Sequence, residues 1–152
     1  MTRRVTQVDD TTGEVLGSFV AVIQPKRQNG FTEGWFAMAQ DALRLLRTAG
    51  LGGRDYDVLF ALLERLDFEN LIQVSQAELA SDCDMRPPHV SRSIKKLLDL
   101  GCLLEGPKIG RSRSFRLNPR FGWKGSTKGH QNALKQRMKA AGLSVIEADQ
   151  KV

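Results

Sequence analysis

Apolar residues recur at helical spacing in the first half of the chain and predict two amphipathic helices. In the first, Thr32 caps a helix that runs through Arg47, and its apolar stripe consists of Trp35, Met38, Ala39, Ala42, Leu43 and Leu46. In the second, Asp55 is the expected cap, and the apolar face consists of Val58, Leu59, Leu62, Leu63 and Leu66. The glycine-rich residues 49–53 separate the two helices, because glycine is unfavourable inside a helix.

A short helix, a turn and another helix are predicted next. Ser75 and Glu78 have the spacing of a capping box, so the short helix begins at Gln76. A new helix opens at Pro87 or Pro88, because proline is tolerated in a first turn. Its buried stripe is Val90, Ile94, Leu97 and Leu98, and on or beside the opposite face lie Pro88, His89, Arg92, Lys95 and Lys96. This pattern is typical of a helix-turn-helix whose second helix enters a DNA major groove.

Two short strands after this helix predict a β-hairpin wing. Gly101 is a natural C-cap, and residues 102–105 and 114–117 read as strands, with turn-forming residues 106–110 between them. Residues 71–74 predict a third strand that pairs with the wing. The tip and the return strand carry cations that would meet phosphates or a minor groove, namely Lys108, Arg111, Arg113 and Arg116.

Both ends of the chain carry further elements. Residues 4–8 and 14–23 are rich in β-branched residues and flank a turn, so they predict an N-terminal β-hairpin. This hairpin would either pack on the winged domain or offer an edge strand to a second copy. Two adjacent cations in the loop that follows, Lys26 and Arg27, would belong to a solvated linker or touch a phosphate. A basic helix over residues 129–141 would pack on a partner subunit or lie along DNA, with a disordered tail beyond it.

Together these elements predict an α+β fold, a winged helix-turn-helix with an N-terminal β-hairpin and helix and a C-terminal basic helix. The expected parts are residues 1–30 for the hairpin and loop, 31–125 for the DNA-binding domain with its preceding helix, and 126–152 for the basic helix and tail. A chain of 152 residues is long enough for one domain with a core.

The charge distribution points to a polyanion as the partner. The chain has a net charge of +6, but residues 86–128 hold 11 Lys and Arg against 2 Asp and Glu, or +9. The remaining 12 basic and 15 acidic residues give −3. A basic block beside a mildly acidic body is typical of nucleic-acid binding. Because the sequence has neither an apolar run of 18 residues nor a signal peptide, we expect no membrane partner and a cytoplasmic location.

The reactive residues do not form a recognised catalytic or metal-binding pattern. Cys83 and Cys102 are expected to be free thiols, and with only His89 and His130 besides, we predict no metal and no cofactor. A strand-nicking enzyme needs a nucleophile, usually tyrosine, near clustered histidines, but Tyr56 begins an apolar helix and the two histidines are 41 residues apart. A Walker-type glycine loop is also missing. We therefore expect a binding protein and not an enzyme.

Two aromatic residues after the wing have two interpretations. Arg120 and Lys124 flank Phe121 and Trp123, and interleaved aromatic and cationic side chains can bind nucleic acid. Alternatively, the two aromatic side chains close the open end of the core.

Several segments resemble the RepL-type plasmid replication proteins, a family of small winged-helix proteins. The matching segments are NGFTEGWFAMAQDAL from Asn29, LDFEN from Leu66, VSQAELA from Val74, VSRSIKKL from Val90 and, most specifically, GPKIGRSRSFRLNPRFGWKG from Gly106 to Gly125. The resemblance covers roughly Asp10 to Lys124. One departure from the family pattern is Asp84, since many such turns carry glycine at this position. It bears on the geometry of the turn, because aspartate adopts left-handed angles less readily than glycine.

The resemblance also implies roles for residues of the second helix. Carried over to this chain, it gives His89, Ser91 and Arg92 as base readers and places Lys95 and Lys96 on phosphates. With the neighbouring residues added, the expected base-reading set is Arg86, Pro88, His89, Ser91 and Arg92. The expected backbone-binding set is Ser75, Gln76, Lys95, Lys96, Lys108, Arg111, Ser112, Arg113 and Arg116.

The function implied by the resemblance is initiation of plasmid replication. The protein would bind double-stranded DNA at the plasmid origin and recruit host replication proteins. The alternative is a winged-helix transcriptional repressor that regulates its own gene, because a fold does not determine a function. Repeated sites beside an A·T-rich tract would favour initiation, and one palindrome over a promoter would favour repression. A homodimer is compatible with both, because paired half-sites add specificity.

Overall fold

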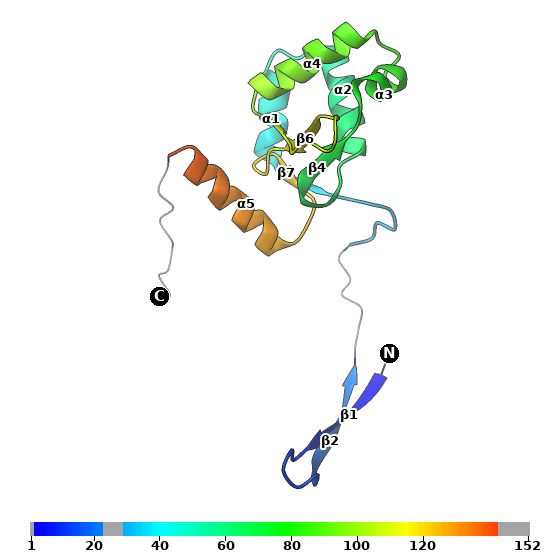
Figure 1. The fold of residues 1–152 in the computed structure, drawn as a ribbon, viewed down its shortest axis with the longest axis vertical. Helices are drawn as coiled ribbons and strands as arrows, with labels where there is room; N and C mark the ends of the chain where they lie inside the picture. The colour runs from blue at the N-terminus through cyan, green and yellow to red at the C-terminus, as the bar shows by residue number, and fades with distance from the viewer. Residues whose placement is uncertain (1, 23–28, 143–152) are drawn as a thin grey trace. The chain divides into compact units, whose positions relative to one another are not determined.

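The N-terminal unit, residues 1–34, contains a two-stranded antiparallel β-hairpin (Figure 1). In this computed structural model, which describes residues 2–22 and 29–142, strand β1 spans Thr2–Val8 and strand β2 spans Val15–Val22. In the connecting turn, Asp9 Oδ1 accepts hydrogen bonds from the N–H groups of Thr11 (2.8 Å) and Thr12 (3.1 Å), and these bonds lower the pKa of Asp9. The predicted hairpin is therefore confirmed. The loop cations Lys26 and Arg27 and the predicted tail lie outside the described residues.

The second unit, residues 35–152, contains a winged helix-turn-helix (Figure 1). Its helices are α1 (Gln40–Thr48), α2 (Gly53–Glu64), α3 (Gln76–Asp82), α4 (Pro87–Asp99) and α5 (Thr127–Ala140), with a short 3-10 helix η1 (Phe68–Asn70). Its strands are β3 (Ala37–Met38), β4 (Leu71–Gln73), β5 (Leu103–Glu105), β6 (Ser114–Leu117) and β7 (Gly122–Trp123). The antiparallel sheet has the order β4-β6-β5, in which β5 and β6 form the wing. The predicted α+β class is correct. We call this unit, residues 35–152, the winged unit.

One hydrophobic core joins the helices to the inner face of the sheet. All five apolar residues predicted for the buried face of α2 are buried, and so are three of the four predicted for α4, with Leu98 half-buried. The side chains that fill the core most completely are Val58, Leu59, Leu62, Ile72, Leu79, Val90, Ile94, Leu97, Leu103, Phe115 and Leu117. On β6, Phe115 and Leu117 face this core, and Arg116 between them lies on the outer face of the sheet.

Helix α1 begins seven residues later than the sequence pattern predicts, at Gln40 instead of directly after Thr32. The reason is a pairing that local periodicity does not reveal. Strand β3 pairs with β7, and the N–H of Ala39 donates to the carbonyl of Phe121 (2.9 Å). Trp35 therefore lies outside any helix and is 39% exposed. Leu43, which is predicted to belong to the buried apolar stripe, is also exposed.

The sequence pattern predicts Asp55 as the cap of α2, but in the structure Asp55 is the third residue of this helix. Gly52 occupies the cap position in an extended conformation, and its N–H donates to Asp55 Oδ2 (2.9 Å). The same buried carboxylate accepts from Ser93 Oγ (2.7 Å) and from Lys96 Nζ (3.1 Å), both on α4. Burial alone would raise the pKa of Asp55, but the three hydrogen bonds and the charge of Lys96 outweigh it and lower that pKa. Asp55 thereby joins α4 to the start of α2.

Asn70 connects three strands through its side chain. Its Nδ2 donates to the carbonyls of Leu117 (2.9 Å) and Gly122 (2.8 Å), and its Oδ1 accepts from the N–H of Lys124 (2.8 Å). The residue is buried and left-handed, with φ of +63°, a conformation that asparagine adopts more readily than most residues. The end of β6 and strand β7 are thus held against the start of β4.

The C-terminal end of α4 is tied to the segment that follows the wing. Gly101 ends the helix with φ of +80°, as predicted for a C-cap glycine. Asn118 Nδ2 donates to the carbonyl of Gly101 (2.8 Å), and its N–H donates to the carbonyl of Cys102 (2.9 Å). Cys102 is fully buried, and this burial raises the pKa of its thiol to about 12.

Phe121 and Trp123 are buried, so their predicted role in closing the core is the correct one. Trp123 Nε1 donates to the carbonyl of Ser126 (2.9 Å), and Ser126 Oγ caps α5 by accepting from the N–H of Gly129 (3.0 Å). Helix α5 is close to the predicted bounds, but none of its residues is buried.

Replacement of Asp55 should destabilise the winged unit. We expect Asp55→Ala to lower the free energy of unfolding by about 2–3 kcal/mol at pH 7, because Gly52 and Ser93 lose a partner. Since the pKa of Asp55 is lowered in the folded state, its contribution is complete above about pH 3.9 and is lost as the pH falls through the folded value. Urea unfolding at pH 7 and pH 3 measures both effects. The exposed Asp57→Ala is the control, and an equal loss in both variants would contradict the assignment.

Replacement of Asn70 should loosen the junction between β4, β6 and β7. We expect Asn70→Ala to lower the free energy of unfolding by about 3 kcal/mol, because two carbonyls and one N–H lose their partner and alanine disfavours a positive φ. Asn70→Asp, which tolerates the backbone angle but cannot donate, should lose most of the same stability. Denaturant unfolding of the three proteins tests this, and an Asn70→Asp variant as stable as the parent would refute it.

Candidate nucleic-acid interface

The turn between α3 and α4 is fixed by local hydrogen bonds and one left-handed residue. Ser75 Oγ accepts from the N–H of Glu78 (3.1 Å), and Glu78 Oε2 accepts from the N–H of Ser75 (3.2 Å), which confirms the predicted capping box. Asp84 has φ of +49° and so adopts the left-handed conformation for which glycine is usually required. Helix α4 then begins at Pro87, the first of the two positions that the sequence allowed.

The N-terminal half of α4 presents polar and basic side chains to solvent. Of the five predicted base readers, Arg86, Pro88, Ser91 and Arg92 are exposed and His89 is half-buried. The hydroxyl of Ser91 donates to Gln76 Oε1 (2.7 Å), so this serine also connects α4 to the start of α3. The structure therefore brings the predicted base readers together with Ser75 and Gln76 on one side of the winged unit.

Arg54 is a residue of this surface that the sequence analysis missed. It lies in the first turn of α2, and its NH1 is 3.1 Å from Nδ1 and 3.3 Å from Nε2 of His89. Desolvation lowers the pKa of His89, and the nearby charges of Arg54, Arg92 and Arg86 lower it further. The sequence shows Arg54 only as a cation directly before the expected helix cap Asp55. Local periodicity does not reveal that the start of α2 lies beside α4, so the contact with His89 could not be predicted.

The two lysines of α4 differ in their surroundings. Lys95 is exposed, and within the described residues it forms no ion pair. Lys96 pairs with Asp55, and 58% of its side chain remains exposed. Lys96 therefore helps to hold α4 on α2 while more than half of its side chain stays accessible to solvent.

The wing places its cations on two different surfaces. Lys108, Arg111 and Ser112 are exposed in the loop between β5 and β6. Arg113 pairs with Glu105 and lies over the ring of Phe115, with 5.1 Å between the guanidinium carbon and the ring centroid. Arg116 is apart from these residues, because it lies on the outer face of the sheet and donates to the carbonyl of Glu69 (3.4 Å).

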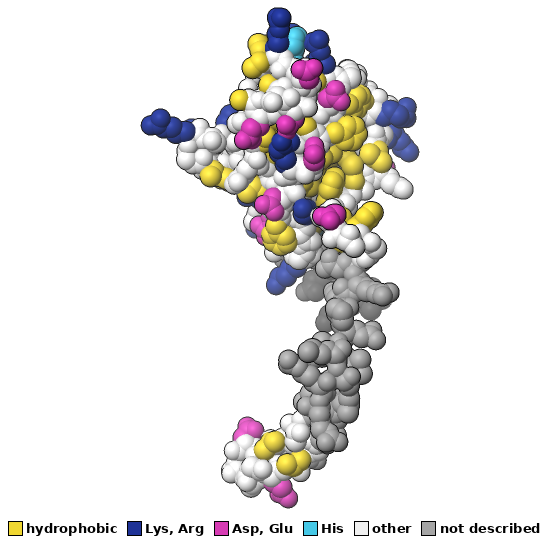
Figure 2. Space-filling model, turned by 90° about the vertical axis from the view of Figure 1, so that its right-hand side faces the viewer, with side chains coloured by type: hydrophobic (Ala, Val, Ile, Leu, Met, Phe, Trp, Pro, Cys, Tyr) yellow, Lys and Arg dark blue, Asp and Glu magenta, His cyan; other side chains and the backbone are white. Residues whose placement is uncertain are grey.

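The end of the winged unit where α4 lies is rich in basic side chains. Figure 2 shows Lys and Arg side chains gathered, beside a histidine, at the end of the unit where α4 lies in Figure 1. Asp and Glu side chains lie mainly across the middle of the same face. The charges of Arg54, Arg86 and Arg92 around His89 create a positive field at this end of the unit.

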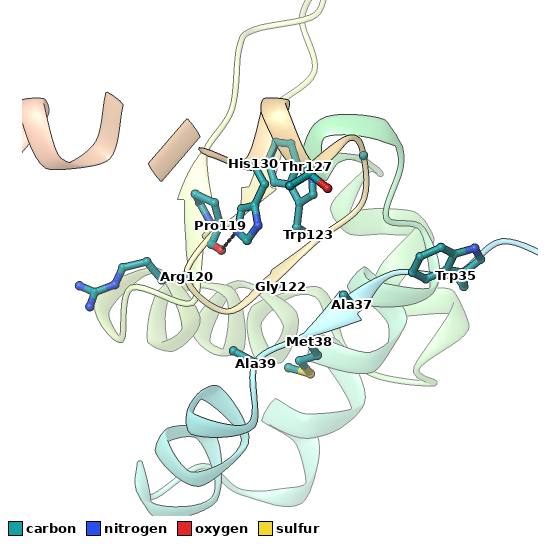
Figure 3. Close-up of a pocket in the computed structure, with 11 residues that line it drawn as sticks. Trp35, Ala37, Met38, Ala39, Pro119, Arg120, Gly122, Trp123, Thr127 and His130 are labelled. Atoms are coloured by element: carbon teal, nitrogen blue, oxygen red, sulfur yellow. Dashed lines mark hydrogen bonds between the residues drawn. The ribbon is translucent and has the colours of Figure 1, made fainter. Parts of the chain in front are cut away.

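A cavity of about 390 Å³ lies between strand β3, the segment that contains β7 and the start of α5 (Figure 3). Its aromatic wall is the pair Trp123 and His130, whose rings stack with centroids 5.1 Å apart. The Nε2 of His130 donates to the carbonyl of Pro119 (2.7 Å), so this histidine is used to hold α5 against the segment after the wing. The cavity is thus built from groups that already serve the fold.

In residues 2–22 and 29–142, no cluster of three or more His, Cys, Asp or Glu side chains could hold a metal ion. Among the helices of that same part, none is long and apolar enough to cross a membrane.

No protein-family model and no curated protein matches the chain. Among solved structures, the chain is similar to the DNA-binding TubR fragment from Clostridium botulinum, with 26% identity over 59% of this chain and 99% of that chain and a TM-score of 0.37. It is also similar to a possible transcriptional regulator from Methanosarcina mazei Go1, with 16% identity over 71% of this chain and 88% of that chain and a TM-score of 0.40.

A third similar structure is a MarR-family transcriptional regulator from Rhodococcus sp. RHA1. The identity is 20%, the TM-score is 0.38, and the match covers 72% of this chain and 71% of that chain. All three TM-scores are low, so the fold assignment rests on the chain's own topology. Helices α2, α3 and α4, followed by the two strands of the wing, form a winged helix-turn-helix.

Proposed function

We propose that this chain is a sequence-specific double-stranded DNA-binding protein that regulates transcription. The observation that carries the proposal is the exposed cationic side of α4, formed by Arg86, Arg92 and Lys95. Within the described residues, none of these three side chains forms an ion pair, so each is available to an anionic ligand. Arg92 and Lys95 lie on the second helix of a helix-turn-helix, and Arg86 is the N-cap residue of that helix. In proteins with this motif, the second helix enters the major groove.

In the proposed complex, the N-terminal half of α4 lies in a major groove. Arg92 and Arg86 are suited to guanine edges, His89 and Ser91 to other base edges, and Pro88 to a thymine methyl group. Phosphates would be held around this helix and by the wing, through Ser75, Gln76, Lys95, Lys96, Lys108, Arg111, Ser112 and Arg113. We add Arg54 to the phosphate-binding set because of its contact with His89. We leave out Arg116, because it lies on the outer face of the sheet.

Transcriptional regulation is the output that requires least beyond DNA binding, because an occupied promoter blocks transcription. Initiation of plasmid replication is the second candidate, and it rests on the resemblance described above. However, two of the resembling segments, LDFEN and FGWKG, meet at Asn70, where they hold the sheet together. Resemblance in those segments therefore argues for a shared fold more than for a shared output.

Fragments bound from the protein's own replicon and chromosome should identify the site and distinguish the two outputs. A single palindrome over a promoter supports regulation, and repeats beside an A·T-rich tract support initiation. We expect Arg92→Ala to weaken the selected site about tenfold to a hundredfold, and to weaken unrelated DNA little, because a base contact is lost. Arg44→Ala, an exposed arginine of α1, is the matched control. Equal losses in the two variants, or no enriched fragment, would contradict base reading by α4.

Binding should depend steeply on salt. If Arg54, Lys95, Lys96, Lys108, Arg111 and Arg113 neutralise six phosphates, log K should fall with log salt with a slope of about −5. We expect Lys108→Ala to reduce that slope by about 1 and to weaken all DNA sequences alike. Fluorescence anisotropy over a salt series measures both values. A slope near zero, or a Lys108→Ala slope equal to that of the parent, would rule out phosphate binding by the wing.

A further inference from the structure

The N-terminal hairpin has two edges that need an explanation. In the described part of residues 1–34, β1 and β2 pair with each other and with no third strand. Each strand therefore leaves one row of backbone N–H and C=O groups without a strand partner. A two-stranded ribbon is marginally stable in water and is normally completed by further strands or a packed helix.

The two edges differ in charge. Strand β1 has the sequence TRRVTQV, with two arginines, whereas β2 has the sequence VLGSFVAV, with no charged residue and no proline. Charged residues protect an edge against pairing with another chain, and an uncharged apolar edge invites such pairing. The edge of β2 is thus the one open to a further strand.

We propose that β2 pairs antiparallel with β2 of a second copy of this chain. The result is a four-stranded intermolecular sheet in the order β1-β2-β2-β1, with a two-fold axis between the two central strands. The alternatives are less favourable on charge and symmetry. Antiparallel pairing of β1 with β1 over its full length would make Arg4 of the two copies diagonal neighbours, which places two like charges close together. Pairing of β2 with β1 would continue without closure. In the proposed dimer both outer edges carry arginines, so growth stops at two chains.

The register of such a dimer follows from the bounds of β2. The strand spans Val15–Val22, and a two-fold axis normal to the sheet requires that opposite residues differ by an even number of positions. The two registers with the largest overlap pair Ser18 with Ser18, or Phe19 with Phe19, of the second copy. In both registers the two Ser18 positions lie on the same face of the sheet, directly opposite or diagonal to each other. Ser18 is also the cross-strand partner of Thr6 on β1. Substitutions at these two positions can therefore be compared directly. A charge at Ser18 lies on the central strand at the proposed dimer contact, whereas a charge at Thr6 lies on the outer strand of the same cross-strand pair.

The dimer is independent of the proposed function, but it would supply the paired units that bind two half-sites. We expect sedimentation velocity of the full chain without DNA to show a dimer. Ser18→Lys should weaken dimerisation roughly tenfold or more, because two like charges meet near the axis, and Thr6→Lys should leave it nearly unchanged. Ser18→Glu alone should also be impaired, whereas an equimolar mixture of Ser18→Lys and Ser18→Glu should recover the dimer.

Recovery in the mixture shows that the hairpin is still folded in both variants. The proposal is overturned if the parent chain is a monomer at all concentrations. It is also overturned if Ser18→Lys dimerises like the parent, if Thr6→Lys is equally impaired, or if the mixture stays monomeric. DNA binding is measured separately with a single half-site. A Ser18→Lys monomer that still binds the half-site separates the dimer from the proposed function. Half-site binding by the dimeric Arg92→Ala that equals that of the parent would count against the proposed function alone.

Discussion

The orientation of α4 depends on one buried carboxylate. Asp55 is 4% exposed, and a charge this well buried is tolerated only when donors surround it. One donor belongs to the start of α2, and the other two, Ser93 and Lys96, belong to α4. A shift of α4 along α2 by one turn would leave the carboxylate with a single donor. The inward hydrogen bonds therefore determine which side of α4 faces outward, and that side carries the cations of the candidate interface.

The helix-turn-helix could be predicted from sequence because its signals are local. The capping box at Ser75, the two prolines and the apolar stripe of α4 lie within a few residues of the backbone they shape. The late start of α1 could not be predicted in this way, because it is caused by pairing between Ala37–Met38 and Gly122–Trp123. Arg54 was missed for the same reason, since its contact with His89 joins two helices that are distant in sequence.

The segments outside the helix-turn-helix acquire a structural meaning through Asn70. LDFEN ends with this residue, and its amide binds the backbone of Leu117, Gly122 and Lys124. Asn118 makes a similar connection between the segment after the wing and the end of α4. Two asparagine side chains thus attach the same backbone segment to the start of the sheet and to the end of α4. The motifs that look least like DNA contacts are the ones that fix the wing relative to α4.

Cys102 is a free thiol that lies at this junction, between the end of α4 and the wing. Its thiol is fully buried directly after α4, and a pKa of about 12 leaves almost none of it as the reactive thiolate at neutral pH. Alkylation of Cys102 therefore requires the core around the end of α4 to open, whereas Cys83 in the turn is only half-buried. The chain thus contains, directly after α4, a natural reporter whose labelling rate measures how often the core opens at this end of the helix.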